Sequence, residues 1–214
     1  MINLEKLQLY QAEKDGNTYY GSVIWKSMFR ARLYKEEQGN LYRQQQIINF
    51  KNRNINKKYF KKVVEVIENY FITDLTIVVP GSSVKLTNLQ KLLNNTYITR
   101  IKEVAQMKYR EKRKIEESEV ETLHIKWAEI KGNKILLIDD MITTGSTMEF
   151  YKQILKTKIN AEFICYGFGL NNKLNPVHIK DLSYEVNDDI NIDELLNSIE
   201  VVMEVKDIYG NIEK

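Results

Sequence analysis

The chain has 214 residues, of which 43% are hydrophobic and 29% are charged. This length and composition suit one globular domain with a substantial core and room for a small appended piece. The net charge of +3, from 32 basic and 29 acidic side chains, is too balanced to indicate nucleic-acid binding by itself. Cys165 is the single cysteine, which excludes an internal disulfide, and His124 and His178 are too far apart for a zinc site of the usual spacing.

Two features of the sequence bear on the cellular location of the protein. Residues 1–6 lack the apolar core of a signal peptide, and no apolar run approaches the length of a membrane-spanning helix. We therefore expect a cytoplasmic protein without a membrane partner.

The first patterned stretch is a predicted β-hairpin. Residues 18–25 are rich in aromatic and β-branched side chains, residues 7–12 alternate apolar and polar side chains around Tyr10, and the two stretches flank the turn sequence Asp15-Gly16-Asn17. Residues 26–46 are mixed and basic-aromatic and give no clear assignment. We therefore expect residues 1–46 to form a small hairpin or hood region.

A helix and a strand-loop-helix unit follow. Residues 47–50 fit a short strand or a helix end, and residues 57–71 repeat apolar side chains at helical spacing below a Lys-rich outer face. Residues 75–79 predict a buried strand, which leads through Pro80-Gly81-Ser82-Ser83 into a helix at 86–93. This loop could bind an anion, or it could be an ordinary Pro-Gly turn with a serine N-cap.

The stretch 100–117 is strongly charged, with basic residues interleaved with glutamates. Such a run is usually a solvated helix with ion pairs along it. A patch that contacts DNA is another possibility.

The strongest pattern lies between residues 135 and 147. Residues 135–138 are four branched apolar residues and predict a strand buried on both faces, and Asp139 and Asp140 follow directly. Next come Thr143, Thr144, Gly145, Ser146 and Thr147, and residues 148–155 then have helical apolar spacing. Unpaired N–H groups at a helix N-terminus suit a phosphate, and ionised carboxylates accept hydrogen bonds from a diol. The pattern therefore indicates a ligand with a phosphate and vicinal hydroxyls, although the threonines could merely cap the helix.

The remaining elements complete an α/β pattern. Residues 120–125 and 162–170 predict strands, and residues 191–203 predict an amphipathic helix that could pad the sheet or cover a dimer contact. Alternating strands and helices predict a mostly parallel sheet with ligands at the carboxyl ends of its strands. We expect an N-terminal region 1–46, a core 47–175 and a C-terminal extension 176–214.

The apolar strand, acidic pair and Thr-Thr-Gly-x-Thr of residues 135–147 resemble the signature of type I phosphoribosyltransferases, which bind 5-phosphoribosyl pyrophosphate (PRPP). The resemblance implies the fold of that family and transfer of 5-phosphoribosyl from PRPP to a nitrogen base. Asp139 and Asp140 would hold the ribose hydroxyls and share Mg²⁺, and residues 143–147 would bind the 5-phosphate. Gly81, Ser82 and Ser83 would bind pyrophosphate, and Arg110 and Arg113 would close over it from a hood loop.

A more specific resemblance is to the ComF family, phosphoribosyltransferase-like proteins associated with bacterial competence and DNA uptake. It involves Ile48-Asn49-Phe50-Lys51, Val79-Pro80 and the basic segment from Gln106 to Arg113. The chain lacks the N-terminal Cys-rich zinc element usual in that family. We therefore keep as alternatives a regulatory protein that binds PRPP or a nucleotide without catalysis, and a ComF-like accessory factor for DNA uptake. The acceptor base is not indicated by any motif.

Overall fold

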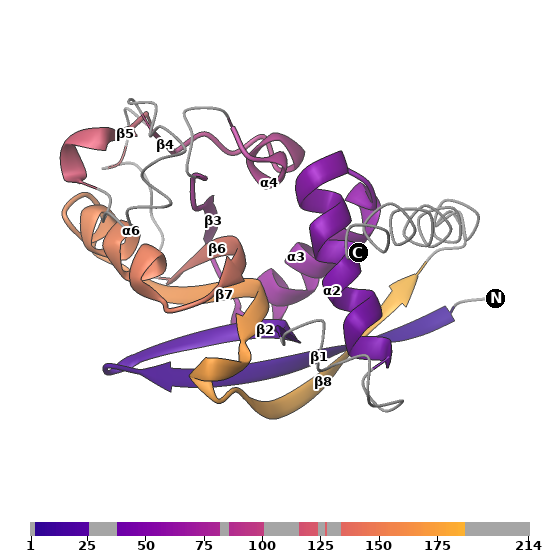
Figure 1. Ribbon diagram of the computed structural model, residues 1–214. Coiled ribbons are helices and arrows are strands. Elements are labelled where there is room, and N and C mark those ends of the chain that lie inside the picture. Colours follow the sequence, from indigo (N-terminus) through magenta and orange to yellow (C-terminus); the bar gives the residue numbers. More distant parts are fainter. Residues whose placement is uncertain are drawn as a thin grey trace, which may run out of the picture.

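The computed structural model of the protein contains a central six-stranded sheet with helices on both faces (Figure 1). The strand order is β3-β6-β7-β2-β1-β8. The strands are β1 (Asn3–Lys14), β2 (Asn17–Trp25), β3 (Leu75–Val78), β6 (Lys134–Ile142), β7 (Glu162–Asn171) and β8 (Val177–Val186). The structure describes residues 3–25, 38–81, 86–100, 116–123, 127 and 134–186.

The sheet has a parallel half and an antiparallel half. Strands β3, β6, β7 and β2 pair in parallel, whereas β1 pairs antiparallel with both β2 and β8. The prediction of an α/β fold with a mostly parallel central sheet flanked by helices is therefore confirmed.

The helices form two layers around this sheet. They are α2 (Gln38–Arg53), α3 (Lys57–Phe71), α4 (Asn88–Leu92) and α6 (Ser146–Lys156). Helices α2 and α3 contribute to one apolar core and α6 contributes to the other, on the opposite face (Figure 1). A small second sheet pairs β4 (Ile98–Arg100) with β5 (Val120–Thr122), and the short 3-10 turns η2 (Glu117–Glu119) and η4 (Asn172–Leu174) complete the described elements.

Strand β6 shows why a continuous apolar run forms the centre of this fold. Leu136 and Ile138 belong to the core below α2 and α3, and Ile135 and Leu137 belong to the core below α6. Successive side chains of a strand point to opposite faces, so every residue of this run is buried. Each such side chain stabilises the fold by about 1.5–3 kcal/mol relative to an exposed position.

The predicted hairpin is present, but it joins the central sheet. Asp15 and Gly16 have φ angles of 51° and 74°, the left-handed pair that a two-residue hairpin turn favours. Strand β2 continues the sheet by pairing with β7, and β8 adds the outermost strand beside β1. The strands of the regions 1–46 and 176–214 thus belong to the same sheet as the core, while the division of the chain at these boundaries stays a prediction.

Several elements differ from their predicted extents. Residues 47–50 are helical, because Ile47 and Phe50 pack into the core from α2. Strand β6 continues to Ile142, because β7 pairs with it as far as Leu170. Strand β8 was not predicted. The predicted helix at 191–203 lies outside the described residues, and no helix in the described ranges is long and apolar enough to cross a membrane.

Candidate functional site at the carboxyl edge of the parallel strands

Two loops with potential ligand-binding groups emerge at the same edge of the sheet. Strands β3 and β6 are parallel neighbours, with Val78 opposite Ile138, and the Val79 N–H donates a 2.8 Å hydrogen bond to the Ile138 carbonyl oxygen. Pro80-Gly81 therefore follows β3 at the level where Asp139 follows Ile138. The structure brings the first part of the Pro80–Ser83 loop and the acidic pair to one edge.

The acidic pair lies inside β6, and its two carboxylates have different surroundings. The Asp140 backbone N–H donates to Asp139 Oδ1 at 2.7 Å, and Lys51 Nζ lies 2.7 Å from Asp140 Oδ2. Lys51 comes from the last turn of α2, on the face to which Asp140 points by strand alternation. Burial and the neighbouring Asp140 carboxylate raise the pKa of Asp139 well above its ordinary value of 3.8. A cation or a hydroxyl donor near Asp139 would therefore favour its ionised form.

The hydroxyl-rich loop presents donors at the start of α6. Thr143, Thr144, Ser146 and Thr147 are exposed, and the Thr144 and Ser146 hydroxyl oxygens lie 2.8 Å apart. Gly145 occupies the N-cap position with φ 81° and provides no side-chain cap, while the Ser146 N–H donates a long hydrogen bond of 3.5 Å to the Thr144 hydroxyl oxygen. First-turn N–H groups of such a helix can bind an anion together with the exposed hydroxyls.

The N-terminal hairpin packs against this loop, a contact that the sequence did not suggest. A Cβ atom placed on Gly145 would lie 2.4 Å from the Tyr19 hydroxyl oxygen, so the ring lies directly against the loop backbone. Lys14 Nζ donates to the Thr144 carbonyl oxygen at 3.1 Å, and Lys152 Nζ of α6 donates to Asn17 Oδ1 at 2.5 Å. Burial raises the pKa of Tyr19 to about 12, which keeps its hydroxyl protonated. The hairpin thus holds the loop in place.

A buried polar cluster lies on the α6 side of the sheet. Arg100 Nη2 of β4 and Glu119 Oε2 of η2 are 3.5 Å apart, with side chains only 2% and 1% exposed. The Tyr151 hydroxyl of α6 is also buried, and burial raises its pKa; Arg100 lowers it, while Asp139 and Glu119 raise it further. No sequence signal distinguished Arg100 from the other basic residues of its run.

The predicted pyrophosphate site is described in part. Ser82, Ser83, Arg110 and Arg113 lie outside the described residues. Gly81 lies beside α4, because a Cβ atom on it would be 3.0 Å from Cγ2 of Thr87, the N-cap residue of that helix.

The carboxylates of this edge could hold a metal ion only together with other ligands. Among the described residues no group of three or more His, Cys, Asp or Glu side chains could hold a metal. Mg²⁺ commonly binds through one or two carboxylates together with water and substrate phosphates. Asp139 and Asp140 fit that mode, in which the cation arrives with its phosphorylated ligand.

A mostly parallel α/β sheet whose acidic strand leads into a hydroxyl-rich helix N-terminus is the architecture of the type I phosphoribosyltransferases. Residues 50–168 match the family described as the phosphoribosyl transferase domain, and the chain belongs to that family. The matched range contains β3, β6, α6 and both loops of the candidate site. No curated protein gives a significant match to the chain. Family membership supports phosphoribosyl transfer as the general class of chemistry.

Proposed function

We propose that the protein transfers the 5-phosphoribosyl group of PRPP to a nitrogen base and releases pyrophosphate. The observation that carries this proposal is the succession, within the family domain, of an acidic pair in the last part of β6, an exposed hydroxyl-rich loop and a helix N-terminus whose N-cap residue is a glycine. In the reaction the bond between ribose C1 and the pyrophosphate oxygen breaks, its electron pair leaves with pyrophosphate, and a bond from nitrogen to C1 forms. The nitrogen then loses a proton.

The proposed roles follow the chemistry of each group. Residues 143–147 and the first turn of α6 anchor the 5-phosphate, so that its binding energy orients the ribose. Asp139 and Asp140 accept hydrogen bonds from the ribose hydroxyls and favour the positive charge that develops at C1. Lys51 neutralises Asp140 before the ligand binds, since its ammonium group is ion-paired with that carboxylate.

Pyrophosphate binding is assigned to the other loop and to the charged segment. We propose that Gly81, Ser82 and Ser83 donate hydrogen bonds to the leaving group and that Arg110 and Arg113 bind it with their forked donors. Mg²⁺, held with the help of Asp139 and Asp140, would neutralise charge on the pyrophosphate when bound.

Calorimetry with Mg²⁺ and PRPP tests the binding step. The wild-type protein should bind PRPP, whereas the Asp139→Asn/Asp140→Asn double variant should lose at least tenfold in affinity. Asp181→Asn is the matched control, because Asp181 is an exposed carboxylate on β8, outside the site. Absence of PRPP binding by the wild-type protein would contradict the proposal.

Pyrophosphate release then distinguishes transfer from binding alone. With PRPP bound, a panel of purine, pyrimidine and nicotinate-type bases should include at least one that triggers stoichiometric pyrophosphate release. If PRPP binds and no base triggers release, the protein is a regulatory PRPP-binding protein rather than a transferase.

We further propose that the chain is related to the ComF proteins. Support comes from Lys51, which ends the Ile48–Lys51 segment of that resemblance and contacts the acidic pair. A ComF-like role in DNA uptake would need a basic surface, and Lys57, Lys58 and Lys61 are exposed on α3. DNA binding that weakens steeply with salt, without affinity for PRPP, would favour this role over transfer.

A further inference from the structure

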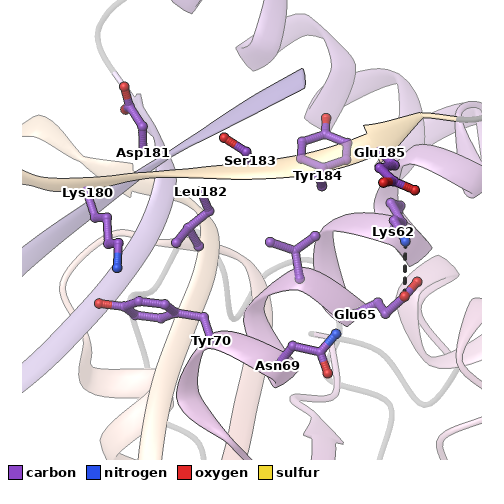
Figure 2. Close-up of a pocket in the computed structure, with 11 residues that line it drawn as sticks. Lys62, Glu65, Asn69, Tyr70, Lys180, Asp181, Leu182, Ser183, Tyr184 and Glu185 are labelled. Carbon is purple, nitrogen blue, oxygen red and sulfur yellow. Dashed lines mark hydrogen bonds and ion pairs between the residues drawn. The ribbon is translucent and has the colours of Figure 1, made fainter. Parts of the chain in front are cut away.

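A groove separates helix α3 from the outermost strand β8 (Figure 2). It has a volume of about 510 Å³, and its walls combine apolar groups of Val66, Tyr70, Leu182 and Tyr184 with charged groups at the rim. None of its lining residues belongs to the candidate PRPP site. A ligand or segment bound in this groove would therefore lie apart from the PRPP site.

Exposed hydrophobic side chains are concentrated on the two elements that form the groove. Five large hydrophobic side chains are exposed in the described part of the chain, and four of them lie on these two elements or at their ends: Tyr70, which lines the groove, and Ile72, Val177 and Ile179, which do not. Strand β8 is also the last strand in the sheet order, so its outer edge pairs with no described strand. Proteins commonly cover such an edge with a helix or a loop.

The end of β8 lies beside the basic half of α3. Figure 2 shows Lys62 near Glu185, while Lys180 lies over the Tyr70 ring with its Nζ 5.3 Å from the ring centre. Strand and helix therefore run in opposite directions, and the chain beyond Val186 starts at the Lys-rich beginning of α3. Lys57, Lys58 and Lys61 are exposed there.

The sequence that follows β8 matches this surface in charge and in pattern. Residues 187–204 contain six acidic side chains and no Lys or Arg. Residues 191–203 repeat apolar side chains at helical spacing, namely Ile192, Leu195, Leu196, Ile199, Val202 and Met203.

We propose that residues 191–203 fold back as an amphipathic helix and dock in the groove between α3 and β8 of the same chain. Thirteen residues of helix span about 20 Å, and the β8 wall from Lys180 to Glu185 spans about 17 Å, so the lengths agree. Residues 187–190 supply the turn. A tether this short gives the segment a high effective concentration at the groove of its own chain, which favours that groove over the groove of a second copy.

Docking covers the open edge of the sheet and neutralises the basic face of α3. It would leave the candidate PRPP site accessible, since the groove and that site share no residue. The proposal does not depend on phosphoribosyl transfer, and a failure of either can be recognised separately.

Zero-length carbodiimide cross-linking of the full-length protein tests the proposal. An equal mixture of ¹⁴N- and ¹⁵N-labelled chains is treated, digested and examined by mass spectrometry. Amide links from Glu200 to Lys180, at the far end of the groove, are expected within chains of a single label. Asp188 and Asp189 are left out of the comparison, because the tether alone brings them near Lys62. Absence of Glu200 links to Lys180 overturns the proposal, and links that join the two labels assign the groove to a second copy instead.

A pair of variants shows whether the apolar face of the segment drives docking. Leu195→Ser/Ile199→Ser should reduce the Glu200 links at least fivefold, whereas Asn197→Ser, on the opposite face, should leave them unchanged. Circular dichroism and urea denaturation verify that both variants are folded. Equal cross-linking in the two variants would contradict docking through the apolar face.

Discussion

The two halves of the central sheet differ in how they use their surfaces. In the parallel half, β6 and β7 are buried on both faces, and the carboxyl ends of β3 and β6 bring two loops to one edge. In the antiparallel half, the buried side chains of β1 and β8 are mixed with half-buried and exposed ones, and β8 ends the sheet. The parallel half therefore brings the candidate ligand-binding groups together at its carboxyl edge. The antiparallel half supports the loop at residues 143–147 and leaves one edge of the sheet open.

The largest effect on stability should distinguish a buried ion pair from an exposed one. Arg100 of β4 and Glu119 of η2 are buried on the α6 side of the central sheet, whereas His178 and Asp181 of β8, in the antiparallel half, form a pair whose side chains are 47% and 42% exposed. Arg100→Met should lower the free energy of unfolding by about 3–5 kcal/mol, because it leaves a buried carboxylate without its partner. Asp181→Asn should change it by less than about 0.5 kcal/mol.

Urea denaturation measures both effects. The Arg100→Met/Glu119→Gln variant should be more stable than Arg100→Met, because the uncompensated charge is gone. If Arg100→Met lowers the free energy of unfolding no more than Asp181→Asn does, burial does not make the Arg100–Glu119 pair more costly to break.

Two glycines with the same backbone conformation offer the next contrast. Gly145 and Gly16 have φ angles of 81° and 74°, but a Cβ atom on Gly145 would meet the Tyr19 ring, while nothing lies within 4 Å of one on Gly16. Gly16→Ala should cost about 1–2 kcal/mol for the left-handed conformation alone. Gly145→Ala should cost about 2–5 kcal/mol, because overpacking adds to that strain.

Thermal and urea unfolding give these stabilities, and calorimetry gives PRPP affinity. Only Gly145→Ala should also weaken PRPP binding, since the loop must shift to clear the Tyr19 ring. Equal stability losses in the two variants would show that the hairpin does not hold the loop.

The same contrast explains which parts of the structure could be predicted from the sequence. Residues 135–138 are apolar without interruption because both faces of β6 are covered, and helix α3 was predicted at its observed bounds because one face of it is buried. Strand β8 mixes charged and apolar residues at a partly exposed edge, and its pattern did not predict a strand. Local pattern thus identifies elements whose burial is uniform.

The candidate site was predictable only where its groups are neighbours in the sequence. The acidic pair and residues 143–147 form one contiguous pattern. Lys51, Tyr19 and Lys14 reach the same edge through tertiary packing, from a helix end and from the hairpin. The contacts of these residues depend on the order of the strands, which no local pattern specifies.

A smaller effect on stability should come from ionisation of Asp139. Its pKa is raised by burial and by Asp140, so the folded state takes up a proton more readily than the unfolded chain, and ionisation above pH 3.8 disfavours folding. Without Mg²⁺, Asp139→Asn should therefore be more stable than the wild-type protein at pH 7, by about 0.5–2 kcal/mol. The difference should shrink as pH falls through the raised pKa towards 3.8.

Urea denaturation in EDTA at several pH values between 4 and 8 checks this prediction. A variant that is less stable than the wild-type protein at pH 7, or a difference that does not depend on pH, would show that burial of Asp139 imposes no such cost.

The smallest effects on stability should come from two largely exposed ion pairs, one at the carboxyl edge and one on α3. Lys51 Nζ lies 2.7 Å from Asp140 with its side chain 59% exposed, and Lys62 Nζ lies 3.0 Å from Glu65 on α3. Lys51→Ala and Lys62→Ala should each cost less than about 1 kcal/mol, as exposed pairs usually do. Of these two variants only Lys51→Ala should alter PRPP affinity, by about threefold to tenfold at a cost near 1 kcal/mol in binding, because Lys51 contacts the acidic pair and Lys62 does not. If both variants bind PRPP as the wild-type protein does, Lys51 neutralises Asp140 in the free protein without taking part in ligand binding, and the function of the carboxyl edge rests on β6 and its loop alone.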